Sequence, residues 1–225
     1  MSVLNKIAFY QGVRDEIPNQ NLARELASTQ NNEGIKEIAE HLWDSNANVS
    51  SDCIKVLYET GYIAPDMIAP YAADFLKLLH SRHNRLVWGA MIALSTIAPL
   101  AAEELFEKRE LICKTIAQGS VITQDAGIKA LALVVAADLQ YLSELNPFLM
   151  NFLRTCRLSD VPRHAEFIEV CLNESNRQEF LAVLQERLPH MTPSQTSRIK
   201  KIINRIERVS LRLFYFIIWK VIILD

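Results

Sequence analysis

Three stretches of the sequence repeat one pattern of small and apolar residues at a constant spacing. The stretches SSDCIKVLYETG, VWGAMIALSTIA and QDAGIKALALVV begin at residues 50, 87 and 124, so the step is 37 residues each time. HAEFIEVCLNES at residue 164 continues the series 40 residues later, and SRIKKIINRIER at residue 197 is a weaker fifth copy. A period of this length indicates an architecture in which neighbouring copies bury each other's apolar faces.

The composition favours helices for these copies. Only six glycines and eight prolines occur in 225 residues, while half of the residues are apolar. Apolar positions recur at intervals of three and four, which is the period of a helix with one buried face. The pattern predicts about ten helices in five pairs: 35–43 with 49–60, 66–80 with 82–99, 102–118 with 121–137, 143–157 with 161–172, and 178–188 with 194–208.

The segments before and after the repeats have a different composition. Residues 1–34 contain a helical pattern over Asn19–Thr29 that NNEG interrupts, which predicts entry helices covering one end of the repeats. We therefore expect a single domain over residues 1–210, with repeats at about 35–208, and an apolar tail over 211–225.

The repeated stretches resemble HEAT repeats, in which the second helix of each pair carries an Ala-Ala-x-Ala-Leu-like core. AMIAL at residues 90–94 is the best match, and Cys53–Leu57, Gly127–Leu131 and Phe167–Cys171 occupy the same slots. The resemblance covers most of Ile35–Arg208. It implies an all-α fold, a right-handed alpha-alpha superhelix of the HEAT-like or armadillo-like solenoid type with about five helix pairs.

The sequence departs from the HEAT pattern at its charged positions. Many HEAT repeats carry an aspartate before the turn and an arginine early in the second helix. Here Asp44 fills the first slot once, and the second slot holds Ser50, Val87, Gln124 and His164. We therefore expect apolar packing, rather than a ladder of aspartates and arginines, to hold the repeats together.

The resemblance also implies that the second helices line a concave surface. The 37-residue step places two rungs on that face, which are Ser51, Trp88, Asp125 and Ala165, then Lys55, Ile92, Lys129 and Glu169. Trp88 and Ile92 would anchor a peptide or a partner helix there. Alternatively, Trp88 fills the groove between two repeats. The candidate partner-binding residues are Lys55, Trp88, Ile92, Asp125, Lys129 and Glu169.

No residue pattern points to catalysis, a cofactor or a metal. The sequence lacks GxSxG, a phosphate-binding glycine loop and HExxH. His80 and His83 have no third ligand at an obvious spacing. The carboxylates near residue 103 fit the N-terminal end of a helix, where acidic side chains are favourable; these are Glu103, Glu104, Glu107 and Glu110.

The cysteines and the N-terminus indicate a cytoplasmic protein. The cysteines are scattered among apolar positions with no CxxC pair, which favours reduced core thiols; they are Cys53, Cys113, Cys156 and Cys171. The sequence MSVLNKIAFYQG lacks the basic segment and unbroken apolar run of a secretory signal.

A non-enzymatic protein-binding scaffold or adaptor is the function that the resemblance best supports, with a protein as the partner. Some HEAT-like proteins are DNA alkylation-repair glycosylases, so nucleic-acid binding is an alternative. The net charge of −2 and the pI near 6.2 argue against it, because nucleic-acid binding usually requires a basic excess.

The tail differs from everything upstream. Basic residues are dense from Arg198 to Arg212, and LFYFIIWKVIILD follows them. These 13 residues are fewer than the roughly 20 that a helix needs to span a bilayer. Three interpretations remain open: a segment packed on the last repeat, an interfacial membrane anchor that makes the protein a membrane-surface adaptor, or a segment foreign to the domain.

Overall fold

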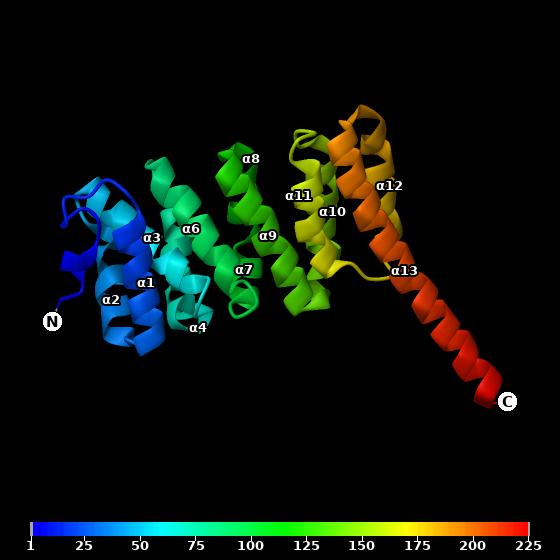
Figure 1. The fold of residues 1–225 in the computed structure, drawn as a ribbon, viewed down its shortest axis with the longest axis horizontal. Coiled ribbons are helices and arrows are strands. Elements are labelled where there is room, and N and C mark those ends of the chain that lie inside the picture. The colour runs from blue at the N-terminus through cyan, green and yellow to red at the C-terminus, as the bar shows by residue number, and fades with distance from the viewer. Residues whose placement is uncertain (1, 225) are drawn as a thin grey trace. The chain divides into compact units, whose positions relative to one another are not determined.

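The computed structural model describes the backbone of residues 2–224 and the side chains of residues 2–208. Within these limits every regular element is a helix (Figure 1). The chain divides into two compact units, residues 1–145 and residues 146–225. Each is described by itself below, and one domain over residues 1–210 stays a prediction.

The first unit contains an entry segment and three helix pairs. A short 3-10 turn, Leu4–Lys6, opens the chain, and further 3-10 turns lie at His41–Trp43, Ala69–Tyr71 and Leu139–Tyr141. Its α-helices are α1 (Ile17–Thr29), α2 (Asn32–Glu40), α3 (Ala47–Gly61), α4 (Pro65–Ile68), α5 (Ala72–Leu78), α6 (Asn84–Ile97), α7 (Ala102–Glu107), α8 (Arg109–Gln118) and α9 (Val121–Ala137), and α10 (Leu142–Thr155) begins at its end.

The three predicted repeat copies form the second helices of these pairs. Helix α3 packs against α6, and α6 packs against α9, while α2, α5 and α8 each pack against the second helix of their own pair (Figure 1). Helix α1 covers the remaining side of α3, as an entry helix should. The 37-residue step in the sequence is therefore the step from one second helix to the next.

Two of the predicted first helices are interrupted. The helix predicted over 66–80 is wrong as one element, because Pro70 has no backbone N–H and its ring obstructs a continuous helix; a 3-10 turn at Ala69–Tyr71 replaces the helix there. The helix predicted over 102–118 is divided at Lys108, where φ is −99° and ψ is 15°. No glycine or proline marks this second break.

Small residues in α6 and α9 let neighbouring helices approach closely. The pairs Gly89–Ala90 in α6 and Ala126–Gly127 in α9 occupy the same two slots of the repeat. A Cβ atom placed on Gly89 would lie 2.9 Å from Cγ1 of Ile54, and one on Gly127 would lie 2.3 Å from Cγ1 of Ile116. The core of this unit is therefore apolar and tightly packed.

The second unit combines apolar packing with arginine contacts. It holds most of α10, then α11 (Val161–Ile168), a 3-10 turn at Glu169–Cys171, α12 (Arg177–Arg187), a 3-10 turn at Leu188–His190, and α13 (Pro193–Leu224). Ile199, Ile202 and Ile206 of α13 are buried. Arg198 and Arg205 also form ion pairs with residues of the α11 segment, in addition to this apolar packing.

The last helix is longer than predicted. The sequence predicts a helix over 194–208, whereas α13 runs from Pro193 to Leu224. The predictions for the side chains of the tail, 211–225, lie outside the described residues. Among the residues that the structure describes, no helix is long and apolar enough to cross a membrane.

Candidate functional site

Aromatic and basic side chains form a continuous row across α3, α6 and α9. Lys55, Tyr58 and Tyr62 follow one another at helical spacing, so they share a face of α3. Trp88 extends this face onto α6, and Lys129 extends it onto α9. We call these five residues the aromatic row.

The rings and cations of the row contact one another directly. The ring centroids of Tyr58 and Trp88 are 6.1 Å apart with a tilt of 56°, and those of Tyr58 and Tyr62 are 6.3 Å apart, edge to face. Nζ of Lys129 lies 5.7 Å from the centroid of Tyr62, a cation–π distance. Residues from three successive pairs thus form one connected row of contacts.

Lys55 is held rigidly at one end of the row. Its Nζ lies 2.8 Å from Oε2 of Glu16, 2.6 Å from Oε1 of Glu59 and 4.9 Å from the centroid of Tyr58. Burial by itself lowers the pKa of this ammonium group, and the hydrogen bonds to both carboxylates more than offset it, so the pKa is raised. Lys55 therefore stays charged and fixed in place.

The entry segment supplies the acidic partner of the row. The hydrogen bond from Lys55 is the main cause of a lowered pKa at Glu16, which also lies 3.2 Å from Nη2 of Arg85 on α6. Burial raises the pKa of Tyr58 and of Tyr62, which favours their neutral hydroxyl forms. Tyr58 and Lys55 are only 5% and 7% exposed, so the accessible part of the row consists of Tyr62, Trp88 and Lys129.

The structure brings together three of the six predicted site residues. Lys55, Trp88 and Lys129 all belong to the row, while Ile92 and Asp125 are half-buried residues of α6 and α9. Trp88 is itself half-buried and packs against Tyr58, so it both fills space between helices and keeps a part of its surface open.

The other predicted positions have different roles. Glu169 belongs to the second unit, where its Oε1 accepts a 2.6 Å hydrogen bond from Nε of Arg205. Ser51, Lys55 and Ala165 are 3%, 7% and 0% exposed, so these three positions are buried and do not lie on an open face as predicted. The 37-residue step does not tell how far each helix is rotated about its own axis. A small rotation is enough to move a residue from the exposed face to the buried one.

Sequence reasoning missed the tyrosines and Glu16. Tyr58 and Tyr62 lie three and seven residues after Lys55 and could have been placed on its face from spacing alone. No local signal indicates Glu16, because its contact with Lys55 joins the entry segment to a different element.

A cavity opens beside the charged end of the row. Its volume is about 540 Å³, and it shares Glu16 and Arg85 with the surroundings of Lys55. The remaining lining comes from the entry segment and the start of α3, namely Ala8, Phe9, Gly12, Val13, Arg14, Asp15, Asn48 and Asp52. Asp52 anchors this segment, since its carboxylate accepts hydrogen bonds from the backbone N–H of Phe9 at 2.8 Å and from Nδ2 of Asn19 at 2.9 Å.

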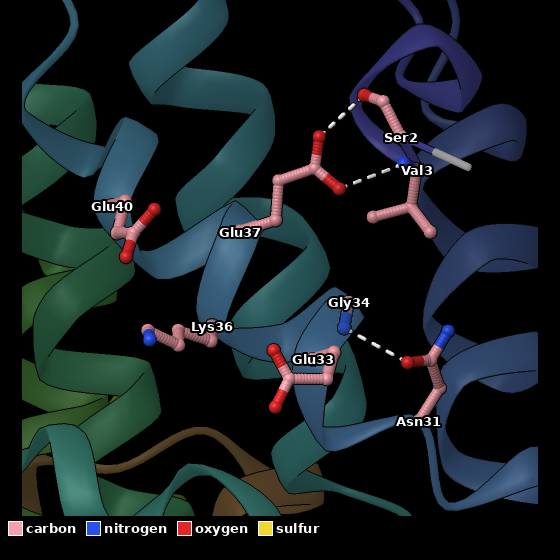
Figure 2. Close-up of a pocket in the computed structure, with 8 residues that line it drawn as sticks. All are labelled: Ser2, Val3, Asn31, Glu33, Gly34, Lys36, Glu37 and Glu40. Atoms are coloured by element: carbon pink, nitrogen blue, oxygen red, sulfur yellow. Dashed lines mark hydrogen bonds between the residues drawn. The ribbon is translucent and has the colours of Figure 1, made fainter.

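A second cavity, of about 430 Å³, lies between the N-terminus and α2 (Figure 2). Glu37 accepts a 2.9 Å hydrogen bond from the backbone N–H of Val3 and another from the Ser2 hydroxyl. Burial raises the pKa of Glu37, but these hydrogen bonds outweigh it and the pKa is lowered. This carboxylate fastens the N-terminal segment to α2, a structural role.

Comparison with known proteins places the fold in a class. The sequence matches no family model and no curated protein. An engineered protein of solved structure matches with a TM-score of 0.65 at 16% identity, over 92% of this chain and 98% of the other. A designed armadillo repeat protein in complex with the peptide (KR)4 matches with a TM-score of 0.63 at 16% identity, over 91% and 100%.

A karyopherin has a similar fold. The karyopherin Kap121p, bound to the SUMO protease Ulp1p, matches with a TM-score of 0.63 at 16% identity, over 91% of this chain and 22% of the karyopherin. The chain is therefore an all-α repeat protein of the armadillo/HEAT-like class, as its sequence period predicts.

Proposed function

We propose that this chain is a non-enzymatic protein-binding scaffold that holds a segment of a partner protein on the aromatic row. The observation that carries this proposal is the continuity of the row across three successive second helices. Tyr62 is 56% exposed, and Trp88 keeps part of its surface open. Large, rigid aromatic side chains contribute disproportionately to protein interfaces.

The charges around the row favour a protein partner over nucleic acid. Lys55 and Arg85 are both engaged by Glu16, and Glu59 adds a further negative charge beside Lys55. A surface for a phosphate backbone would need unmatched cations. A mixed-charge rim around aromatic rings is instead typical of protein interfaces.

The structural neighbours support the same conclusion. The designed armadillo repeat protein is in complex with a peptide, and the karyopherin is in complex with a protease or with Pho4p. In this chain two carboxylates already fix the Lys55 side chain, so little side-chain conformational freedom is lost when a partner binds. Pre-organisation of this kind raises affinity without new contacts.

A peptide-library selection tests the proposal. Random peptides displayed on phage are selected on the immobilised full chain, and the Kd of each enriched peptide is measured by fluorescence anisotropy. Trp88→Ala or Tyr62→Ala should weaken binding by about 2 kcal/mol, or ~30-fold. Lys129→Glu should weaken it less and change the charge preference of the peptides.

Trp43 provides a matched control. It is 46% exposed and has Nζ of Lys77 at 4.6 Å from its ring, yet it lies in the turn after α2, a first helix. Trp43→Ala should leave peptide affinity unchanged, and circular dichroism should show that all variants are folded. Selected peptides that bind folded Trp88→Ala and Tyr62→Ala as tightly as the unmodified chain would refute the site.

A further inference from the structure

The cavity beside the charged end of the aromatic row lies on the same side of α3 and α6 as the row itself. Asn48 and Asp52 line the cavity and precede Lys55 by seven and three residues, so all three share one face of α3. Arg85, another lining residue, precedes Trp88 on α6 by three residues. Three helical residues rise about 4.5 Å, which about two residues of extended chain span. A partner segment that covers Trp88 therefore reaches the edge of the cavity.

The carboxylates that line this cavity already have donors within the chain. Asp52 and Asp15 each accept a 2.8 Å hydrogen bond from a backbone N–H group. Glu16 is paired with two cations, Lys55 and Arg85. The negative charge of the lining is thus balanced by the protein's own groups.

The two arginines that line the cavity keep unused donors. A guanidinium group has five N–H donors in a planar fork whose geometry matches a carboxylate. Arg14 is exposed, and its side chain has no ion pair or hydrogen bond with any residue in the part of the chain whose side chains are described. The side chain of Arg85 is 45% exposed and has a single contact of 3.2 Å with Glu16 among the same residues. The lining therefore offers free donors on two cations.

Two helix starts and an apolar edge complete the lining. Asn48 and Arg85 are the second residues of α3 and α6, and the N-terminal end of a helix carries a partial positive charge. Phe9 and Val13 add apolar surface, at 37% and 38% exposed. The cavity thus suits a small anion that is attached to an apolar group.

The lining carboxylates also decide which anion fits. Asp15, Glu16 and Asp52 repel a doubly charged phosphate group more strongly than a singly charged carboxylate, because the repulsion is proportional to the charge. The volume of about 540 Å³ is that of a small-ligand site, which does not accommodate a nucleic-acid backbone. A carboxylate with an apolar neighbour meets both conditions, and a protein carries one at its C-terminal end and on each acidic side chain.

We propose that the cavity binds a carboxylate of the partner segment between Arg14 and Arg85, while Trp88 contacts the neighbouring part of the segment. Phe9 and Val13 contact the apolar group next to this carboxylate. The inference rests on the proposed function, because the partner is the segment that the aromatic row binds. It adds a charge requirement, namely a carboxylate about two residues from the side chain that covers Trp88.

Synthetic peptides with different ends test the proposal. Random peptides fused to phage through their N-termini are selected on the immobilised full chain. Each enriched peptide is synthesised with a free acid, an amide, an amidated glutamate or an amidated phosphoserine at its end, and the Kd of each form is measured by fluorescence anisotropy. The acid should bind about tenfold more tightly than the amide. Tight binding of the glutamate form shows that a side-chain carboxylate suffices, and weak binding shows that the chain end is required.

Arg14→Gln is the most informative variant, because Arg14 has no partner in the described part of the chain and its loss should leave the fold intact. It should weaken binding of the acid form about tenfold and leave the amide form unchanged, and Arg85→Gln should act in the same direction. Arg24→Gln and Arg82→Gln are the matched controls, since both residues are exposed and neither lines the cavity. Circular dichroism checks that each variant is folded.

Three results would overturn the proposal: equal affinity of the acid and amide forms, equal loss in Arg14→Gln and Arg24→Gln, or tighter binding of the phosphoserine form than of the glutamate form. The two proposals also fail separately. If Trp88→Ala weakens every form while acid and amide bind equally, the row binds the segment and the cavity does not. If Trp88→Ala has no effect while Arg14→Gln weakens the acid form, the cavity binds the peptide and the row does not.

Discussion

The two units of this molecule hold their helices together in different ways. In the first unit, small residues let helices approach: Gly89 of α6 lies against Ile54 of α3, and Gly127 of α9 leaves room for Ile116 of α8, where a Cβ atom would lie 2.3 Å away. In the second unit, Arg198 of α13 donates two hydrogen bonds to Glu166, and Arg205 of α13 donates two to Glu169. The first unit has ion pairs too, such as that of Lys55 with Glu16, but α3, α6 and α9 meet through packing, whereas the α11 segment and α13 add ion pairs to packing.

The difference has a consequence for how each unit responds to its surroundings. Apolar packing depends on shape and buried area, which salt and moderate pH changes affect little. Exposed ion pairs are screened by salt and are lost when their carboxylates are protonated. The contacts between α3, α6 and α9 should therefore be sensitive to changes of side-chain volume, and those between the α11 segment and α13 also to ionic conditions.

The largest effect should come from Ile54→Ala. Ile54 is fully buried in α3 against Gly89, and its truncation leaves a cavity. We expect a loss of about 2–5 kcal/mol, measured by urea unfolding and by hydrogen exchange of α6 amides. Ile63→Ala, at a site that is 54% exposed, is the control and should change stability little. A loss that disappears at high salt would contradict packing as its cause.

Gly127→Ala should have a smaller effect, and it should destabilise the fold although this exchange normally stabilises a helix. In an exposed helix the exchange of glycine for alanine stabilises by about 1 kcal/mol. Here the added methyl group would meet Ile116, and we expect a net loss of about 1–2 kcal/mol. The exposed Ala117 of α8 gives the reference, since Ala117→Gly measures the helix preference alone. Stabilisation by Gly127→Ala would mean that the helices are not closely packed at this position.

The smallest effect should come from the arginine pairs. Arg198→Gln and Arg205→Gln remove exposed pairs that are each worth about 0.2–1 kcal/mol. Hydrogen exchange of α11 amides should increase at low salt, and the difference should fade at about 1 M salt, where the Debye length is ~3 Å. Lys36→Gln with Lys114→Gln is the control for charge removal.

The pH dependence of the same variants gives a second readout. The hydrogen bond from Arg198 is the main cause of a pKa of Glu166 below its ordinary 4.5. Because the folded pKa is the lower one, the stabilisation is complete above the unfolded pKa and is lost as pH falls through the folded value. In the unmodified chain, protection of α11 amides from hydrogen exchange should therefore fall at acid pH. Arg198→Gln should make this fall smaller, and an unchanged pH profile would exclude the ion pair as its source.

The sequence predicted the helix pairs well because their cause is local. The apolar period of three and four residues defines each helix, and the 37-residue step defines the order of α3, α6 and α9. It also placed Lys55, Trp88 and Lys129 on one face. Pro70 could have predicted the interruption of the helix over 66–80, but the apolar periodicity continues across it. The break at Lys108 has no signal in the sequence.

The sequence by itself therefore determined the class of the fold, while the face on which a partner binds stays a prediction. Only the tertiary structure decided that Glu16 holds Lys55 and that Tyr62 lies beside Lys129. It alone also decided that Glu169 is tied to Arg205. The physical reason is that apolar periodicity is a property of a single helix. Contacts between distant residues depend instead on how far each helix is rotated and shifted against its neighbour.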